Sequence, residues 1–342
     1  MITVFSEDHR LREARTELFG GELVEPHERP SRAEIVLRHV QAAGLGAIRP
    51  PCDFGLDPVL RVHDADFVDF LSSAWDLWQT AGYKGEAIPT CWPARRMAQR
   101  RPDHIDGLLG YYALATETSL TQGSWPAARA SANVALTAAE LVAQGARSAF
   151  ALCRPPGHHA ALDMYGGFCF LNNAAIAAQY LRDHGAARVA VLDVDFHHGN
   201  GTQDIFYARE DVLFASIHGD PRFAFPHFLG YADETGAGPG EGFNCNYPLP
   251  EGTGFGPWSD ALEDALHRIG RFRAEALVVS LGLDAFENDP ISGFRLVSGD
   301  FATLGTRLAR TGQPTLFVLE GGYDLEALGE NTVNVLRGFD EA

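Results

Sequence analysis

Five apolar runs along the chain have the length and residue types of buried β-strands. They cover residues 148–153, 188–194, 212–217, 277–284 and 315–319. Helices are predicted between and around these runs, over residues 31–43, 65–81, 105–120, 125–144, 173–184, 258–273 and 299–311. Strands that alternate with helices form βαβ units, so the pattern predicts an α/β fold with a mostly parallel central sheet and helices on both faces.

Polar residues stand at or just past the end of every one of these runs. They are His158 and His159 after a Pro-Pro-Gly turn, Asp193 and Asp195, His218, Asp284, and Glu320. Ligands of open parallel sheets bind beyond the carboxyl ends of the strands. The convergence of these residues therefore predicts an active site at that edge of the sheet.

The densest of these segments is residues 193–202, which read DVDFHHGNGT. Successive side chains of a strand point to opposite faces, so Asp193, Asp195 and His197 are expected on one face as the strand ends. Carboxylates this close repel one another unless a cation or a protonated histidine lies between them. Asp195 and His197 are therefore candidate metal ligands, and Asp284 is the candidate third. The alternative for Asp284 is a helix N-cap, but the pair upstream favours metal ligation.

Composition bounds the class of protein. The chain has 342 residues, enough for one large α/β domain, and a formal net charge of −18 from 45 acidic and 27 basic residues. Nucleic-acid binding needs a basic surface, so this charge argues against it. An acidic surface attracts small cations, although an acidic protein without that role would have the same balance.

No membrane or secretion signal is evident in the sequence. The N-terminal residues lack the basic and apolar regions of a signal peptide, and no apolar run is long enough to span a bilayer. The five cysteines include no C-x-x-C pair, which indicates a reducing compartment. We therefore expect a cytoplasmic protein without a membrane partner, with Cys153 and Cys169 as small core residues.

Residues 82–104 stand apart from the periodic pattern. They contain several prolines, a tryptophan and the basic residues Arg95, Arg96, Arg100 and Arg101. Loops of this length within a domain are usually functional or form interfaces, the alternative being an ordinary surface loop.

Several segments resemble the histone deacetylase superfamily, in the order in which that family has them. They are an early segment at His63 and Asp64, residues 155–159 (PPGHH), 166–173 (GGFCFLNN), 193–202 and 320–323 (EGGY). Further segments, at residues 5–9, 219–221, 228–232 and 289–292, are similar to the bacterial acetylpolyamine amidohydrolase branch. The resemblance implies one arginase/deacetylase-like catalytic domain over residues 1–342. It also implies that residues 82–104 are an insertion that helps form a homodimer and narrows the active-site mouth.

The resemblance also implies metal ions and their ligands. Asp195, His197 and Asp284 are expected to hold Zn²⁺, although two carboxylates and one imidazole also suit Fe²⁺, Co²⁺ or Mn²⁺. A structural K⁺ is expected on Asp193, Asp195, the His197 carbonyl, Ser216 and the Ile217 carbonyl.

Catalytic roles follow from the same resemblance. In the family each paired histidine is oriented by a partner, at positions that match Asp193 for His158 and Asn200 for His159. An aspartate stabilises an imidazolium and an asparagine orients a neutral ring. His159 is therefore the candidate general base, and His158 a charged electrostatic aid. Tyr323 is expected to stabilise the oxyanion of the reacting acetyl group together with the metal.

The family's narrow substrate tunnel is walled by two aromatic side chains. Phe168 and Phe225 match these positions, and Gly167 is expected to line the floor of the tunnel. Ile291 stands where the eukaryotic polyamine-specific relative has a gatekeeper glutamate, so selectivity must come from other residues.

An acidic residue near the mouth is needed to bind the distal ammonium of a polyamine. Glu17 and Asp106 stand where the branch carries acidic polyamine contacts. Glu117 and Glu22 are rivals for this role.

The sequence predicts a zinc-dependent deacetylase that hydrolyses small N-acetylated polyamines such as acetylputrescine, acetylcadaverine or acetylspermidine. The first alternative is a protein or peptide acetyl-lysine deacetylase with the same chemistry. The second is a non-catalytic sensor of acetylated ligands, which would require the loss of a catalytic group, and none is missing. An arginase-like two-metal hydrolase would need more Asp and His residues at the paired-histidine turn.

Overall fold

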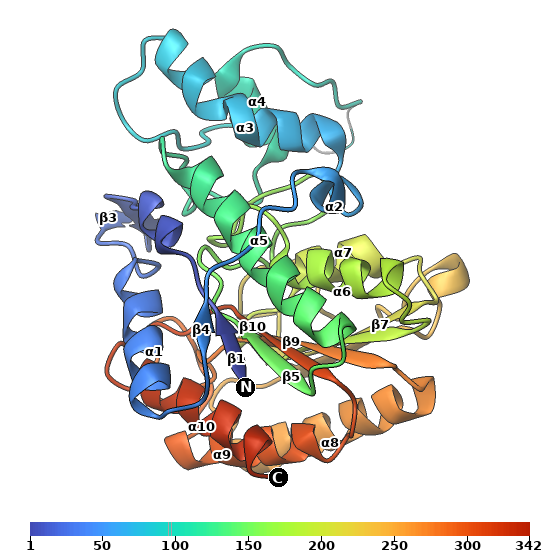
Figure 1. Cartoon of the computed structure of the whole chain (residues 1–342). Helices are drawn as coiled ribbons and strands as arrows, with labels where there is room; N and C mark the ends of the chain where they lie inside the picture. Colours follow the sequence, from blue (N-terminus) through green and yellow to red (C-terminus); the bar gives the residue numbers. More distant parts are fainter. Residues whose placement is uncertain (95, 97) are drawn as a thin grey trace.

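Strands with apolar side chains on both faces form the centre of the molecule. The computed structural model describes residues 1–94, 96 and 98–342, so Arg95 of the basic group lies outside the described residues. Eight strands form one sheet in the order β4-β1-β5-β10-β9-β6-β7-β8, and all neighbouring pairs are parallel (Figure 1). The strands are β1 (Ile2–Val4), β4 (Ile48–Arg49), β5 (Ser148–Ala151), β6 (Val189–Asp193), β7 (Val212–Gly219), β8 (Asn244–Leu249), β9 (Ala276–Leu281) and β10 (Thr315–Leu319).

Alternate residues of β6 enter two separate hydrophobic cores. Val189 and Val191 pack into the core beneath α3 (Ala65–Thr80), α5 (Ser124–Ala143) and α6 (Asn173–Asp183). Ala190 and Leu192 pack into the core of the opposite face, which holds four further helices. These are α1 (Ser31–Ala42), α8 (Phe255–Phe272), α9 (Ser298–Ala309) and α10 (Leu328–Asp340). The predicted fold class, a parallel sheet with helices on both faces, is confirmed.

All five strands predicted from apolar runs are present, within a few residues at their ends. β1, β4 and β8 were not predicted, because β1 and β4 have only three and two residues and β8 contains two asparagines and a proline. The short helices α2 (Asp57–Leu60) and α7 (Asn200–Phe206) and the C-terminal α10 were not predicted either.

The helix predicted over residues 105–120 is wrong beyond its first half. Helix α4 covers Ile105–Tyr112 and ends where Ala113 adopts an extended conformation. Ala113 then pairs with Tyr165, and the Leu114 amide donates to the Tyr165 carbonyl. This pairing with a distant segment outweighs local helix propensity, and it leaves the residues that follow free to reach the substrate cavity.

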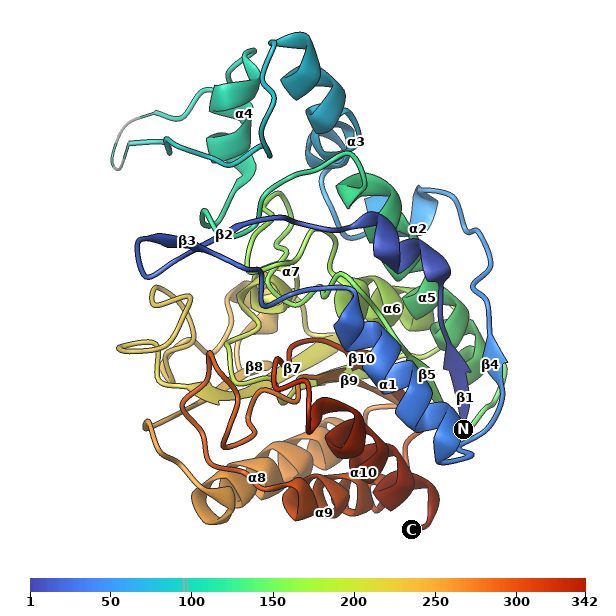
Figure 2. The ribbon, with the colours of Figure 1, turned by 90° about the vertical axis from the view of Figure 1, so that its left-hand side faces the viewer.

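The order of the strands reverses between β6 and β9. From β6 the chain continues through β7 to β8 at one edge, and then returns to β9 and β10 on the other side of β6. A reversal of this kind opens a crevice at the carboxyl ends of the two strands. The hairpin of β2 (Glu17–Phe19) and β3 (Glu22–Val24) projects from one side of the molecule (Figure 2).

Helices α3 and α4 extend away from the sheet, together with the segment at residues 82–94 (Figures 1 and 2). Trp78 Nε1 donates to the Gly85 carbonyl, and Trp92 Nε1 donates to the Ala113 carbonyl. The segment is thereby tied to both helices. Within the described residues, no helix combines the length and the apolar composition needed to cross a membrane.

A matched pair of leucines tests the two-sided core. Leu192 is fully buried at the end of β6, whereas Leu60 is 43% exposed. Leu192→Ala should lower the free energy of unfolding by about 2–5 kcal/mol, because a cavity remains in a packed core. Leu60→Ala should change it by less than about 0.5 kcal/mol. Denaturant titration of the two variants measures the difference, and equal effects would contradict the assignment of Leu192 to the core.

Candidate active site

The three candidate metal ligands meet where β6 and β9 end. Asp195 and His197 follow β6, Asp284 follows β9, and one ligand atom from each lies within 4.8 Å of the others. His197 Nδ1 is 3.0 Å from Asp284 Oδ2 and 3.2 Å from Asp195 Oδ1. Asp195 and Asp284 are fully buried, and His197 is 9% exposed.

The charges of this group explain why it fits a cation. Burial raises the pKa of Asp284 to about 8, and the neighbouring Asp195 carboxylate adds to the effect. Burial opposes protonation of His197, but its hydrogen bonds to the two carboxylates raise its pKa to about 10. Two carboxylates held together away from water require positive charge between them. A divalent metal ion supplies it, and oxygen and imidazole donors suit such an ion.

Two glycines leave room for the carboxylates. A Cβ on Gly321 would lie 2.5 Å from Asp195 Oδ2 and 2.6 Å from Asp284 Oδ2, and a Cβ on Gly282 would lie 2.2 Å from Asp195 Oδ2. The Gly321 amide donates to Asp195 Oδ2 over 2.8 Å, and the Phe196 amide donates to Asp284 Oδ1 over 2.7 Å. The backbone therefore both admits the carboxylates and orients them.

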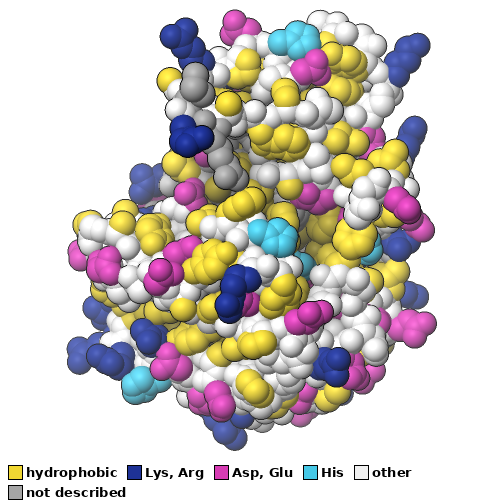
Figure 3. Space-filling view, turned by 180° about the vertical axis from the view of Figure 1, so that it is seen from behind, with side chains coloured by type: hydrophobic (Ala, Val, Ile, Leu, Met, Phe, Trp, Pro, Cys, Tyr) yellow, Lys and Arg dark blue, Asp and Glu magenta, His cyan; other side chains and the backbone are white. Residues whose placement is uncertain are grey.

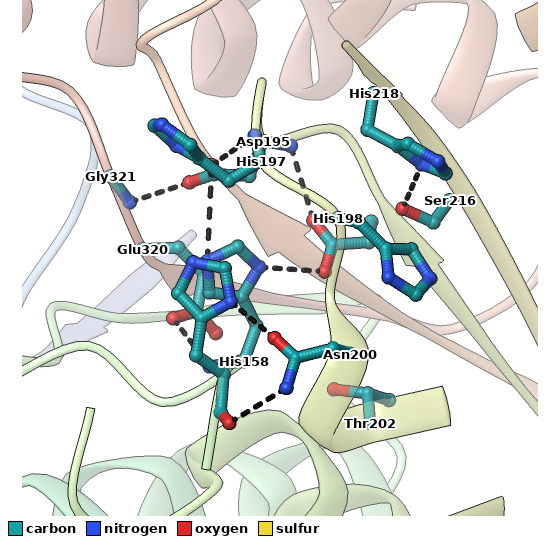
Figure 4. A network of polar contacts seen from close by, with 12 residues as sticks. His158, Asp195, His197, His198, Asn200, Thr202, Ser216, His218, Glu320 and Gly321 are labelled. Carbon is teal, nitrogen blue, oxygen red and sulfur yellow. Dashed lines mark hydrogen bonds and ion pairs between the residues drawn. The ribbon is translucent and has the colours of Figure 1, made fainter. Parts of the chain in front are cut away.

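The paired histidines differ in their partners and in their charge. His158 Nδ1 donates to Asp193 Oδ2 over 3.0 Å, and His159 Nδ1 donates to Asn200 Oδ1 over 2.6 Å (Figure 4). Burial lowers the pKa of His158, but the carboxylates of Asp195 and Asp193 outweigh it and raise the pKa to about 10. Burial lowers the pKa of His159 well below its usual value, and the positive rings of His158 and His197 lower it further. Next to each other stand one imidazolium and one neutral imidazole.

Glu320 fixes the turn that carries these histidines. Its Oε2 accepts a hydrogen bond from the amide of Gly157 over 2.6 Å. The same oxygen accepts a hydrogen bond from the amide of His158 over 3.2 Å (Figure 4). Arg32 donates to the carbonyls of Glu320 and Gly322, each over 2.6 Å, and its guanidinium lies 4.6 Å from the centre of the Tyr323 ring. These contacts connect the histidine turn to the segment that carries Tyr323.

A cavity of about 390 Å³ opens onto this group. His159, His197 and Tyr323 lie among its lining residues, and so do Phe168, Phe225, Gly167 and Ile291. The Phe225 ring stands edge-on to His159 at 5.0 Å, and the Phe168 ring is 5.7 Å from Tyr323. In the space-filling view from this side, hydrophobic side chains gather around a hollow below the protruding helices (Figure 3). The predicted tunnel residues therefore share one cavity with the catalytic candidates.

The acidic residues of the cavity differ in part from those expected. Glu17, Glu117 and Glu251 line it, and no lysine or arginine does so among the residues described. Glu117 accepts from the Gly167 amide over 2.7 Å, and burial raises its pKa. The acidic side chains in the wall of the cavity suit a positively charged ligand.

Two of the acidic candidates lie elsewhere in the chain. Asp106 does not line the cavity, because helix α4 carries it on the protruding part, where it accepts a hydrogen bond from the Tyr83 hydroxyl over 2.5 Å. Its expected ammonium contact is therefore not found within one chain. Glu22 is exposed on β3 and does not line the cavity either.

The expected potassium ligands come from neighbouring strands. Asp193 pairs with Ser216 in the register of β6 and β7, and both residues, like Ile217, are fully buried. The Ser216 hydroxyl is 2.8 Å from His218 Nδ1, and burial lowers the pKa of His218 to about 4. The polar residue at the end of this strand is thus a neutral histidine that pairs with Ser216.

Comparison with known proteins identifies the family to which this arrangement belongs. A family model, that of the histone deacetylase domain, matches residues 26–339. The chain belongs to the histone deacetylase family. It is 57% identical over 338 residues to the acetylpolyamine amidohydrolase of Mycoplana ramosa, with 99% of each chain covered. It is 56% identical over 340 residues to acetylpolyamine amidohydrolase 2 of Pseudomonas aeruginosa, with the same coverage.

A solved structure shares the fold over almost the whole chain. The crystal structure of the acetylpolyamine aminohydrolase from Burkholderia pseudomallei matches with a TM-score of 0.94 at 41% identity, covering 99% of this chain and 98% of that one. The resemblance to the deacetylase superfamily and to its acetylpolyamine amidohydrolase branch, drawn above from short motifs, is thereby confirmed.

Two buried acids hold backbone segments of the site in position, and the sequence alone assigned no such role to either of them. Glu320 holds the histidine turn, and Asp289 accepts hydrogen bonds from the amides of Tyr323, over 2.7 Å, and Ile291, over 3.1 Å. Both belong to motifs that the resemblance included, EGGY and the segment at 289–292. A carboxylate that binds backbone amides has no periodic signature, so its partner cannot be read from the sequence.

Gly321→Ala tests the fit of the metal site. The added methyl group would meet both candidate ligand carboxylates, so we expect at least a tenfold loss of Zn²⁺ affinity with the fold retained. Gly270→Ala, in helix α8, adds a methyl group where no atom lies within 4 Å and serves as the control. Chelator competition measures the affinity, and unchanged binding in Gly321→Ala would rule out ligation at this place.

Proposed function

We propose that the chain is a metal-dependent deacetylase that hydrolyses small N-acetylated polyamines to the free amine and acetate. One observation carries the proposal. A neutral histidine, a tyrosine hydroxyl and a candidate metal centre face one cavity, whose wall carries aromatic and acidic side chains. The first three groups suit amide hydrolysis, and the wall suits an aliphatic chain that ends in an ammonium group.

Asp195, His197 and Asp284 would hold the metal ion, for which we propose Zn²⁺. Such an ion polarises the acetyl carbonyl and lowers the pKa of the attacking water. Fe²⁺, Co²⁺ and Mn²⁺ fit the same donors.

His159 is the proposed general base. Its low pKa keeps the ring neutral, and the hydrogen bond from Nδ1 to Asn200 leaves Nε2 free to accept a proton. It takes the proton of the attacking water and later delivers it to the nitrogen of the leaving amine. His158, held positive by Asp193 and Asp195, favours the negative charge that develops beside it.

Tyr323 is the proposed donor to the carbonyl oxygen of the acetyl group. Burial raises the pKa of its hydroxyl well above the usual value, so the proton stays on the oxygen. The hydrogen bond strengthens as the carbonyl oxygen becomes an oxyanion. Arg32 and Asp289 hold its ring and its amide, so the hydroxyl meets the substrate in a fixed position.

The substrate class rests on the acids of the cavity and on the relatives. Glu17 and Glu117 line the cavity without a cationic neighbour in its described lining, which favours an ammonium group over a neutral chain. Two relatives that match 99% of the chain, at 57% and 56% identity, are acetylpolyamine amidohydrolases. Acetylputrescine, acetylcadaverine and acetylspermidine are the substrates we propose.

Further assignments belong to the proposal as well. A structural K⁺ would lie on Asp193, Asp195, the His197 carbonyl, Ser216 and the Ile217 carbonyl. Residues 1–342 would form one catalytic domain. The working protein would be a cytoplasmic homodimer, with residues 82–104 at the interface between its two subunits.

Substrate competition tests this function. Zinc-loaded protein should hydrolyse acetylputrescine and acetylcadaverine with at least tenfold higher kcat/KM than an acetyl-lysine peptide, because the ammonium meets the acidic wall. Tyr323→Phe should lose about 100-fold to 1000-fold in kcat. Tyr180→Phe, on helix α6 and away from the cavity, should leave kcat unchanged.

The other outcomes separate the alternatives. A preference for the peptide would make the chain a protein deacetylase. Tight binding of acetylated amines without turnover would make it a sensor. Full activity of Tyr323→Phe would remove the tyrosine from the mechanism.

The partner of His159 controls the pH dependence of the reaction. Asn200→Asp places a carboxylate on Nδ1, which stabilises the imidazolium and raises the pKa of His159. The base must be neutral to act, so the acid limb of the kcat/KM profile should move to higher pH by about one unit or more. Asn334→Asp, on helix α10, is the control for the added charge. A profile that does not move would assign the base to another group.

A further inference from the structure

Glu17 is held in the wall of the cavity by a histidine. Its Oε2 accepts the His27 amide over 2.9 Å, and its Oε1 lies 3.1 Å from His27 Nδ1. Glu17 is 3% exposed, whereas the His27 side chain is 19% exposed. The carboxylate therefore has a fixed position, and its partner can exchange protons with solvent.

The surroundings of His27 come from four segments. The ring of Phe19 on β2 stands edge-on at 5.3 Å, and the ring of Tyr323 stands edge-on at 6.5 Å. The charged groups that act on His27 are Glu17, Asp289 in the loop after β9, and Arg29 in its own segment. The hydrogen bond to Glu17 raises the pKa of His27, while Arg29 acts in the opposite direction.

We propose that His27 determines the specificity of the cavity for cationic substrates through the charge of Glu17. When His27 is neutral, it donates a hydrogen bond and the pair carries one negative charge toward the cavity. When His27 is protonated, the pair is neutral overall and attracts an ammonium group less. The inference rests on the proposed function, because it concerns the ammonium group of the same substrates.

Glu17 and the half-buried Glu117 both line the cavity, and of these two acids Glu17 is the one that can be switched in this way. Glu117 accepts hydrogen bonds from the Gly167 amide and the Thr118 hydroxyl, neither of which gains charge near neutral pH. His27 does not line the cavity itself, so it acts through Glu17 and is a positioning residue.

The direction of the pH effect follows from these charges. As pH rises through the raised pKa of His27, the proton leaves and the negative charge of Glu17 is no longer balanced. Preference for a cationic over a neutral substrate of the same shape should therefore increase with pH. Titrating groups that affect the hydrolysis of both substrates equally cancel in the ratio of the two kcat/KM values.

The experiment compares acetylputrescine with N-pentylacetamide, in which a methyl group replaces the ammonium. We expect the ratio of their kcat/KM values to rise roughly fivefold between about pH 6 and about pH 8.5, mainly through KM. In His27→Asn, the amide still donates to Glu17 and the ratio should stay high at both pH values. In Glu17→Gln, it should stay low at both. His267→Asn, exposed on helix α8, is the matched control and should follow the parent protein.

A ratio that does not change with pH in the parent protein, or that changes equally in His27→Asn, would overturn the inference. Calorimetric titration with cadaverine separates this result from a failure of the proposed function. If neither amide is hydrolysed but cadaverine affinity still rises with pH only when His27 is present, the pair is confirmed and the deacetylase proposal fails. If the amides are hydrolysed but cadaverine affinity has the same pH dependence with and without His27, the deacetylase proposal stands and the role of His27 fails.

Discussion

Repulsion between buried carboxylates is the constraint on which the rest of this structure depends. Asp193, Asp195 and Asp284 are fully buried beside one another at the ends of two neighbouring strands. Each ionised carboxylate in such surroundings costs several kcal/mol unless hydrogen bonds or opposite charge offset the cost. The imidazolium of His158 supplies part of that charge, and a divalent ion held by Asp195, His197 and Asp284 would supply the rest. The groups that offset the cost of burying these carboxylates are therefore the same groups that take part in the proposed hydrolysis.

The fold satisfies this constraint with backbone groups that come from several strands. Amides of Phe196 and Gly321 orient two of the acids, and the amides of Gly157 and His158 bind the fourth buried acid, Glu320. All of these segments begin where parallel strands end, so their positions follow from the register of the sheet. The sheet thus places the segments that carry the candidate catalytic groups, and hydrogen bonds to backbone amides hold these groups in position.

The sequence predicts the parts of this arrangement that leave a local signature. Apolar runs gave the inner strands, and motifs gave the candidate metal ligands, the paired histidines and Tyr323. Contacts between distant segments leave no such signature, and there the predictions were incomplete. Pairing of Ala113 with Tyr165 ended a predicted helix early and placed Glu117 in the cavity. The location of Asp106 on a protruding helix depends on packing that no spacing along the chain reveals.

The floor and the wall of the cavity treat charge in opposite ways. On the floor, the buried carboxylates accept hydrogen bonds from histidines and backbone amides, because a carboxylate without partners there would be fully desolvated. On the wall, Glu17 has one partner that gains and loses a proton, and Glu117 has partners without charge. Negative charge that the protein leaves unbalanced in a partly open cavity is available to a ligand. Fixed charge at the reacting bond, with a carboxylate some distance from it, suits the hydrolysis of small cationic amides.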